Sequence, residues 1–442
     1  MNMTPKEIVA YLDDYIIGQK DAKKTIAIAL RNRYRRMQLS EELQEEIMPK
    51  NILMIGSTGV GKTEIARRMA KMMGLPFVKV EASKYTEVGF VGRDVESMVR
   101  DLAYEAVNLV QKEYEEKNQS AIDAEVIRQI VEILVPPLPE TASENAKESF
   151  IKTYNMMEEK VVSGIIDDKK ITIELPKKTH VEIVDSNIPM DLSSVSESIN
   201  NMLGKLGKEK IKKEVTIKQA KKLLRTTASE NLLDKESINA EAVNRCENGG
   251  IIFLDEIDKI ATGANNKSQD PSKEGVQRDL LPIVEGSSVH TKYGQIKTDH
   301  ILFIAAGAFH VSKPSDLLPE LQGRFPLRVE LNPLDEEALY KILTNTKNSL
   351  LRQYKALLEV EGVNLEFEDG AIREFARLSV SANEKAEDIG ARRLHTVIEK
   401  VLEDISFDAD EKKGQTVIVT KELVQSKLEN IAQNEDTARY IL

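Results

Sequence analysis

The chain has 442 residues, of which 41% are hydrophobic and 31% are charged, so it is long enough for two or three domains and apolar enough to bury their cores. Its formal net charge of -11 argues against a general nucleic-acid-binding surface. The one cysteine, Cys246, excludes a disulfide framework and predicts a cytoplasmic protein. The amino terminus has no apolar signal core, and no apolar stretch reaches the length of a membrane span.

The amino-terminal residues predict a helix over 4–12, with Thr4 as its N-cap and proline at its first position. The next apolar group, Ile16, Ile17 and Gly18, is compact and suits a surface for an adenine ring. A simple turn packed on the core is the alternative. A basic amphipathic helix follows over 20–37, and we interpret its arginines as a solvated face, with a subunit contact as the alternative.

A glycine-rich stretch lies between an apolar run at 52–55 and a helical pattern at 64–70. This is the context of a phosphate-binding P-loop, in which glycines let several N–H groups point at one oxyanion and the helix amino terminus adds partial positive charge. We expect Lys62 to reach the β- and γ-phosphates of ATP and the Thr63 hydroxyl to bind Mg²⁺. A turn that matches by chance is the alternative. The nucleotide contacts predicted here are Gly56, Thr58, Gly59, Val60, Gly61, Lys62, Thr63 and Glu64.

A second strand is predicted at 77–80 and a helix over about 94–110. Between them, Gly89 and Gly92 bracket Phe90 and Val91. Such a loop is costly to order unless its apolar tip packs or has a function. A functional loop and a loop whose phenylalanine fills the core are both compatible with this stretch.

The character of the chain changes between residues 111 and 242, where glycine is scarce and charges of both signs are dense. A proline-rich stretch at 135–139 interrupts the helical patterns. We predict an inserted, mostly helical domain over 111–242, because the P-loop precedes this segment and the rest of the site follows it. The nucleotide-binding domain would then consist of 1–110 and 243–332.

The strand predicted at 251–254 ends in two acidic residues, Asp255 and Glu256. A continuous apolar strand is typical of a buried parallel sheet. Acidic residues often follow buried strands, but together with a P-loop they indicate a nucleotide hydrolase. We expect Asp255 to hold Mg²⁺ through water and Glu256 to accept a proton from the attacking water.

The remaining chain predicts a helix over 273–284 and strands at 301–305 and 327–331. The alternation of strands and helices indicates an α/β fold with an open parallel sheet. Asn332 and Pro333 break this pattern, and a helical small domain is predicted over 333–442. Its helices are expected at 336–360, 369–383 and 390–407, and its two short strands, 364–367 and 416–419, should pair.

Taken together, these motifs resemble the HslU (ClpY) family, AAA+ ATPases that work with the HslV peptidase. The resemblance covers nearly the whole chain and is weakest across the insertion. It rests on the P-loop, Tyr15-Ile16-Ile17-Gly18-Gln19, Gly89-Phe90-Val91-Gly92, Phe253-Leu254-Asp255-Glu256, Pro319-Glu320-Leu321-Gln322-Gly323-Arg324, Ile389-Gly390-Ala391-Arg392-Arg393-Leu394 and the Tyr-Ile-Leu end. The resemblance implies a ring, expected to be a hexamer, that hydrolyses ATP to unfold substrate polypeptides and deliver them to a separate HslV-type peptidase.

The resemblance also implies roles for particular residues. Arg324 would be an arginine finger that reaches a neighbouring subunit's nucleotide, with a surface salt bridge as the alternative. Glu320 would orient that finger or touch the nucleotide. Arg392 would be the small domain's nucleotide sensor, with Arg393 as its competitor. The Gly89-Phe90-Val91-Gly92 loop would grip substrate in a central pore, and Tyr440, Ile441 and Leu442 would dock on the peptidase.

One departure from the wider AAA+ pattern lies at the end of the fourth strand, where a polar residue often positions water. The sequence here is Ala305-Ala306-Gly307-Ala308-Phe309, and none of these side chains can form a hydrogen bond. The group that takes this role stays open.

No zinc site or hydrolase nucleophile is predicted, because the chain has no Cys-x-x-Cys, His-Glu-x-x-His or Gly-x-Ser-x-Gly motif. An ATPase of this kind would therefore need a separate peptidase. The alternative function is a nucleotide-gated scaffold that remodels DNA or protein complexes without threading. Glu256 argues against a module that only binds nucleotide, because such a switch needs no hydrolytic base. The net negative charge of the chain argues against DNA as its substrate.

Overall fold

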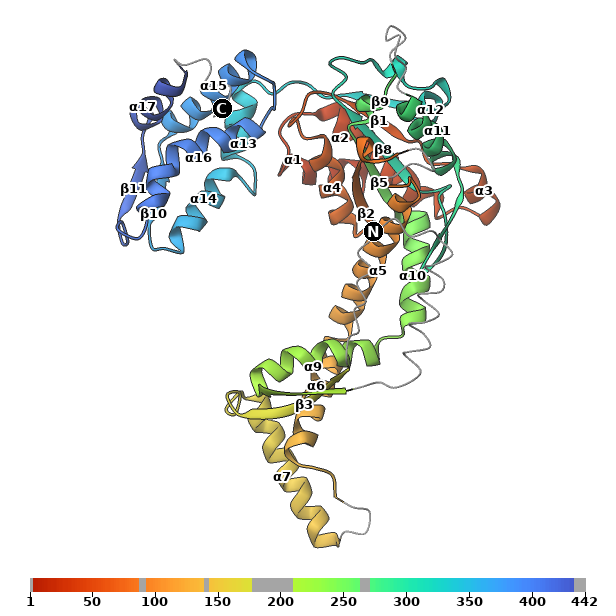
Figure 1. Ribbon diagram of the computed structural model, residues 1–442, viewed down its shortest axis with the longest axis vertical. Coiled ribbons are helices and arrows are strands. Elements are labelled where there is room, and N and C mark those ends of the chain that lie inside the picture. The colour runs from red at the N-terminus through yellow and green to blue at the C-terminus, as the bar shows by residue number, and fades with distance from the viewer. Residues whose placement is uncertain (1–2, 87–92, 139–142, 177–209, 263–270, 433–442) are drawn as a thin grey trace. The chain divides into compact units, whose positions relative to one another are not determined.

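The computed structural model describes residues 3–86, 93–138, 143–176, 210–262 and 271–432 (Figure 1). The chain divides into two compact units, one formed by Met1–Ala106 with Asn244–Leu442 and the other by Val107–Val243. No helix in the described ranges is long and apolar enough to cross a membrane. The predicted loop at Gly89–Gly92 and the tail at Tyr440–Leu442 lie outside the described residues.

The first unit is built on a parallel five-stranded sheet with the order β2-β5-β8-β1-β9. This confirms the predicted α/β fold with a parallel sheet. The central strands β5 and β8 are apolar and almost wholly buried, as strands covered on both faces must be. The strands are β1 (Ile52–Ile55), β2 (Phe77–Glu81), β5 (Ile251–Asp255), β8 (Leu302–Gly307) and β9 (Leu327–Glu330).

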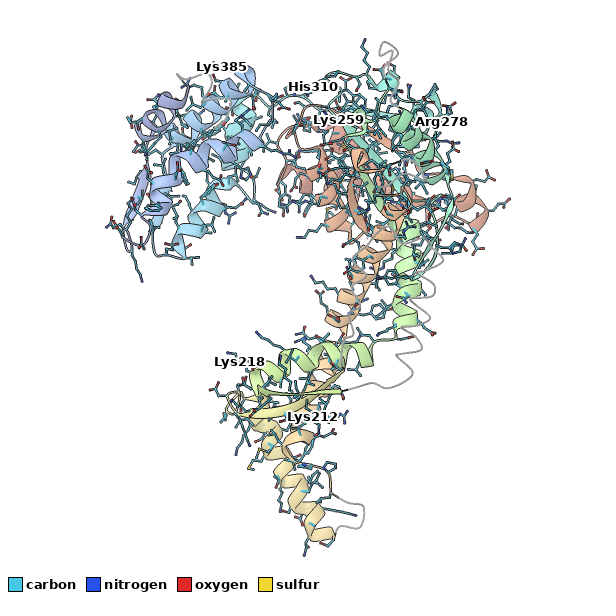
Figure 2. All side chains as sticks on the ribbon, viewed as in Figure 1. Lys212, Lys218, Lys259, Arg278, His310 and Lys385 are labelled. Carbon is cyan, nitrogen blue, oxygen red and sulfur yellow. The ribbon has the colours of Figure 1, made fainter. Side chains whose placement is uncertain are left out.

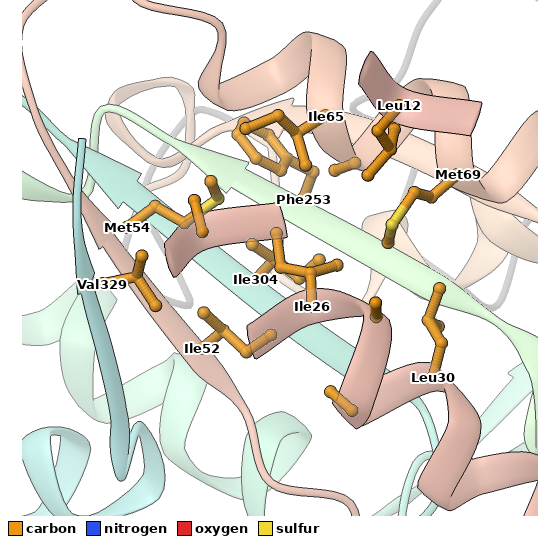
Figure 3. Packing of buried hydrophobic residues seen from close by; sticks show 14 of the residues in the cluster. Leu12, Ile26, Leu30, Ile52, Met54, Ile65, Met69, Phe253, Ile304 and Val329 are labelled. Carbon is orange, nitrogen blue, oxygen red and sulfur yellow. The ribbon is translucent and has the colours of Figure 1, made fainter. Parts of the chain in front are cut away.

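Helices pack on the sheet through an apolar core that joins distant segments, as Figure 3 shows for Ile26, Ile52 and Phe253. The first helix begins as predicted, with Thr4 and Glu7 forming a capping box. The helices of this region are α1 (Pro5–Asp13), α2 (Lys20–Arg36), α3 (Glu41–Glu46), α4 (Lys62–Met73), α5 (Ser97–Lys117), α10 (Lys235–Gly249), α11 (Pro271–Glu285) and α12 (Pro319–Arg324). Short 3-10 turns, η1 (Ala82–Lys84), η2 (Ile257–Lys259) and η3 (Pro314–Asp316), and a hairpin of β6 (Ser288–Thr291) and β7 (Gly294–Lys297) complete it.

The interpretation of the arginines of α2 as a solvated face is wrong for two of them. Arg33 and Arg36 are only 9% and 7% exposed. The Arg33 guanidinium donates to the carbonyl oxygens of Gly249, Gly250 and His300. These carbonyls lie where β5 and β8 begin, so a charged group can be buried because it satisfies backbone acceptors there.

The Val107–Val243 unit is mostly helical, with an additional antiparallel hairpin. The buried residues Ile171, Ile173 and Val215 of the hairpin pack on α6 and α9 around one apolar core. The alternation of apolar and polar residues at 170–175 is a strand signal that the helical prediction overlooked. The elements are α6 (Gln119–Leu134), α7 (Glu144–Val162), β3 (Lys170–Pro176), β4 (Lys210–Thr216) and α9 (Ile217–Leu232).

The carboxy-terminal part of the first unit has its own apolar core. Its two strands, β10 (Asn364–Phe367) and β11 (Thr416–Val419), pair in parallel, which confirms their predicted pairing. The single helix predicted over 336–360 is wrong, because Ser349 caps a new helix by accepting from the Arg352 N–H. The helices are α13 (Glu336–Thr344), α14 (Leu350–Glu359), α15 (Asp369–Lys385), α16 (Arg392–Phe407) and α17 (Lys421–Ala432).

We predict that Arg33→Ala lowers the thermal stability of the protein, because it removes the guanidinium donor of the Gly249 and His300 carbonyls, whereas Gly250 O still accepts from the Leu302 N–H. The expected cost is about 3 kcal/mol. The matched control is Arg35→Ala on the same helix, whose exposed side chain donates to Asn32 Oδ1. Thermal unfolding followed by circular dichroism should show a lower Tm for Arg33→Ala alone. Equal shifts for both variants would contradict the structural role of Arg33.

Candidate functional site

The P-loop connects β1 to α4 and turns tightly at two glycines. Gly59 and Gly61 have φ angles of +75° and +106°, which glycine adopts without strain. Lys62 is the first residue of α4 and is 8% exposed. Its Nζ donates to the carbonyl oxygens of Gly56 at 2.5 Å and Ser57 at 2.8 Å. The ammonium group is therefore held inside the loop by backbone acceptors.

The charges that act on Lys62 include carboxylates at the end of β5 and just after it. Burial lowers the pKa of Lys62, and the carboxylates of Asp255 and Asp258 oppose this shift. Asp255 is the last residue of β5, and Asp258 lies just after it on η2. In the sheet, β8 is the strand between β5 and β1. Parallel strands thus bring the P-loop and the acidic residues to one edge of the sheet.

Two residues on or just after β2 hold the acidic pair, and the sequence reasoning missed both. Lys79 Nζ lies 2.7 Å from Asp255 Oδ2, and Ser83 Oγ donates to Glu256 Oε2 at 3.2 Å. Glu256 has a φ of +57°, a costly conformation for this residue type, and its N–H donates to Asp255 Oδ1. The register that places Lys79 opposite Phe253 was not visible in the sequence.

Two clefts adjoin this edge of the sheet, and both are lined by Thr58, Lys62, Asp255 and Glu256. The larger has a volume of about 800 Å³ and also includes Lys259 and His310, which Figure 2 labels. The smaller has a volume of about 400 Å³ and also includes Thr63, Glu64 and Arg392. These volumes are in the range of small-molecule sites.

The segment that leads into α16, in the carboxy-terminal part of the first unit, touches the P-loop directly. The Ala391 N–H donates to Gly59 O at 3.3 Å, and a Cβ built on Gly59 would lie 2.0 Å from Ile389 O. Glycine at position 59 is therefore required for this approach. Arg393 is 3% exposed and donates to Asn383 Oδ1 and Glu387 O, whereas Arg392 is exposed and lines the smaller cleft.

The residues predicted to hold adenine do not line either cleft. Ile16 is buried in the main core, and its Cγ2 lies 3.7 Å from a Cβ built on Gly61. Ile17 is half-buried, and Gly18 has a φ of +68°. The following residue, Gln19, is buried. Its Nε2 donates to the carbonyl oxygens of Asn332 and Val60, and its Oε1 accepts from the Asn332 N–H. Sequence reasoning gave Gln19 no role.

The predicted arginine finger also lies away from the clefts within one chain. Arg324 pairs with Glu285 at 2.9 Å and its side chain is 49% exposed. Glu320 lies on the exposed side of the same short helix. In a single chain this arrangement is the surface salt bridge that we named as the alternative.

Oxygen donors suited to Mg²⁺ are present near Lys62. The Thr63 hydroxyl and the Asp255 carboxylate belong to residues that line the same cleft. Mg²⁺ usually takes one or two protein oxygens and keeps several waters, so this sparse donor set fits it. No group of three or more histidine, cysteine or acidic side chains that could hold a metal occurs among the described residues.

Comparison with known proteins identifies the family. The family model "AAA domain (Cdc48 subfamily)" matches residues 145–328, and "ATPase family associated with various cellular activities (AAA)" matches residues 52–135. The "ATP-dependent protease ATPase subunit HslU" of Helicobacter pylori strain HPAG1 is 62% identical over 443 residues, covering 100% of this chain and 99% of the relative. Its counterpart in Campylobacter jejuni subsp. jejuni serotype O:23/36 is 61% identical, covering 100% of both chains. The chain is an AAA+ ATPase and belongs to the HslU family of ATPase subunits of ATP-dependent proteases.

Proposed function

We propose that this ATPase unfolds substrate polypeptides and feeds them to a separate HslV-type peptidase. The observation that carries the proposal is the full-length match to relatives named as ATPase subunits of an ATP-dependent protease. The absence of a hydrolase nucleophile motif from the sequence agrees with a peptidase on another chain. These relatives do not favour a remodelling scaffold that works without a peptidase.

The residues that line the cleft would have different roles during ATP hydrolysis. Lys62 would release the carbonyls of Gly56 and Ser57 and bind the β- and γ-phosphates, with the P-loop N–H groups around them. Thr63 and Asp255 would hold Mg²⁺, which offsets phosphate charge when bound. Glu256 would take the proton of the attacking water, and Ser83 would orient its carboxylate.

The remaining nucleotide contacts would come from both domains. The phosphates would be surrounded by the backbone and side chains of Gly56, Thr58, Gly59, Val60, Gly61 and Glu64. Ile16, Ile17 and Gly18 would cover adenine after a local movement, since they do not line the clefts described above. Arg392 lines the smaller cleft with Lys62 and would report the γ-phosphate to the small domain.

We further propose a homo-oligomeric ring, with six subunits as the family expectation. Arg324 would then leave Glu285 and reach the nucleotide of the adjacent subunit, with Glu320 beside it. Phe90 and its neighbours Gly89, Val91 and Gly92 would grip substrate in the pore. The proposed domains are 1–110 with 243–332, 111–242 and 333–442. We propose a cytoplasmic location, in line with the single, buried Cys246.

Glu256→Gln should retain ATP binding and block turnover, whereas Lys62→Ala should abolish binding because it removes the cation that offsets phosphate charge. The loss in turnover for Glu256→Gln should reach on the order of a hundred-fold or more. The matched control is Glu81→Gln. Glu81 lies at the same edge of the sheet, opposite Asp255, and its carboxylate pairs with Lys84. Phosphate release and binding of a fluorescent ATP analogue separate the two effects. Turnover of Glu256→Gln at the parent rate would refute the assignment of the base.

Arg324→Ala should reduce hydrolysis by roughly a thousand-fold and spare ATP affinity. The defect should act in trans, so mixed rings with Lys62→Ala subunits, which keep an intact Arg324, should regain part of the activity. Arg328→Ala is the control, since this exposed arginine of β9 donates to Gln322 Oε1. Verified mixed rings without any recovery would count against a finger between subunits.

Deleting residues 440–442 should leave basal ATP hydrolysis intact and abolish degradation of a folded substrate by an added HslV-type peptidase. The three apolar side chains and the carboxylate would fill a pocket on the peptidase, and several tails around a ring would bind together. Degradation is followed with the parent chain, ATP and peptidase as the reference. Full peptidase activation by the truncated chain would contradict the docking role. No degradation by the parent chain would contradict the proposed function itself.

A further inference from the structure

The carboxylate of Asp258 lies in the larger cleft and has no part in the roles assigned above. It is the middle residue of η2, the short turn that begins directly after the left-handed Glu256. Its backbone is anchored, because Ser312 Oγ donates to Asp258 O at 3.1 Å. Lys259, which follows it on η2, is labelled in Figure 2 and lines the same cleft. The backbone of Asp258 is thus tied to the segment that follows β8.

Asp258 occupies the space that a side chain at the end of β8 would need. A Cβ built on Gly307 would lie 2.8 Å from Asp258 Oδ1 and 2.7 Å from Phe309 Cε2. Phe309 has a φ of +54°, which turns the chain after β8. Glycine at 307 therefore gives the Asp258 carboxylate access to the carboxyl end of this strand. The strand itself offers no polar side chain there.

Asp255 and Glu256, the acidic residues of this cleft that were given roles above, each have a partner. Lys79 pairs with Asp255, and Ser83 donates to Glu256. In the described part of the chain, no donor reaches the Asp258 carboxylate. Its charge nevertheless acts on Lys62, whose pKa it raises against the effect of burial. A phosphate held by Lys62 would experience the same charge as a repulsion.

A carboxylate close to bound phosphates is tolerated when it accepts hydrogen bonds from water. We propose that Asp258 is a positioning residue that holds water at the carboxyl end of β8, next to the γ-phosphate position. The carboxylate would replace the polar side chain that β8 lacks. The proposal rests on the ATPase activity and is independent of delivery to a peptidase.

The first test compares Asp258→Ala, Asp258→Asn and Asp316→Asn in the full chain. Asp258→Ala should lower kcat for ATP on the order of a hundred-fold, as misplaced reacting groups do. Asp258→Asn keeps an acceptor oxygen and should retain part of that rate. Asp316 lines the same cleft, and its Oδ2 accepts from the Lys313 N–H. Asp316→Asn removes one negative charge from the cleft, as Asp258→Asn does, and should keep the parent rate.

The second readout is equilibrium binding of a slowly hydrolysed ATP analogue in the absence of divalent metal. Both Asp258 variants should bind it more tightly than the parent, because a repulsive charge near the phosphates is gone. A merely structural residue would give weaker binding instead. Unchanged kcat in Asp258→Ala, or weaker metal-free binding in both variants, would overturn the proposal.

A third comparison displaces the carboxylate without changing it. Gly307→Ala should lower kcat as Asp258→Ala does, since the new methyl group pushes Asp258 Oδ1 aside. Because that methyl group also meets Phe309, the double variant Gly307→Ala with Phe309→Leu is the control. The proposal predicts no recovery in the double variant. Full recovery would place the effect on Phe309 and overturn the role of Asp258.

Discussion

The pairing of β8 with both β1 and β5 is the constraint on which the nucleotide site depends. It sets the P-loop and Asp255 at one edge of the sheet although a whole compact unit separates them in the sequence. The pairing holds because β5 and β8 are almost continuously apolar and buried, and β1 is buried beside β8. Arg33 joins α2 to the carbonyls that precede β5 and β8, at the ends of these strands away from the site.

The same edge of the sheet is also where the carboxy-terminal part of the first unit meets the P-loop. Ala391 donates to Gly59, and only a glycine at 59 permits the approach of Ile389. A change in the P-loop backbone would therefore act on this part of the chain through a direct contact. Gln19 adds a second link, because it bonds both to Val60 and to Asn332, which precedes α13.

Sequence reasoning predicted the parts of this site that are local in the chain. The P-loop, the strand before Asp255 and the pairing of β10 with β11 all follow from residue patterns of a few positions. Residues whose contacts arise from strand register and backbone turns were missed, namely Lys79, Ser83, Gln19 and Asp258. Arg33 was misjudged for a related reason, since burial of a charged group depends on acceptors that other segments supply. The helix break at Ser349 and the strand at 170–176 have local sequence signals that were overlooked.

We expect ATP to bind with its phosphates between Lys62, Thr63 and Asp255. A structure of the full chain with a slowly hydrolysed ATP analogue and Mg²⁺ would show this placement. In that structure, Lys62 Nζ should have left the carbonyls of Gly56 and Ser57 and should contact phosphate, with the metal between Thr63 and Asp255. Phosphates bound elsewhere, or a Lys62 that still donates to its own loop beside bound nucleotide, would contradict this placement.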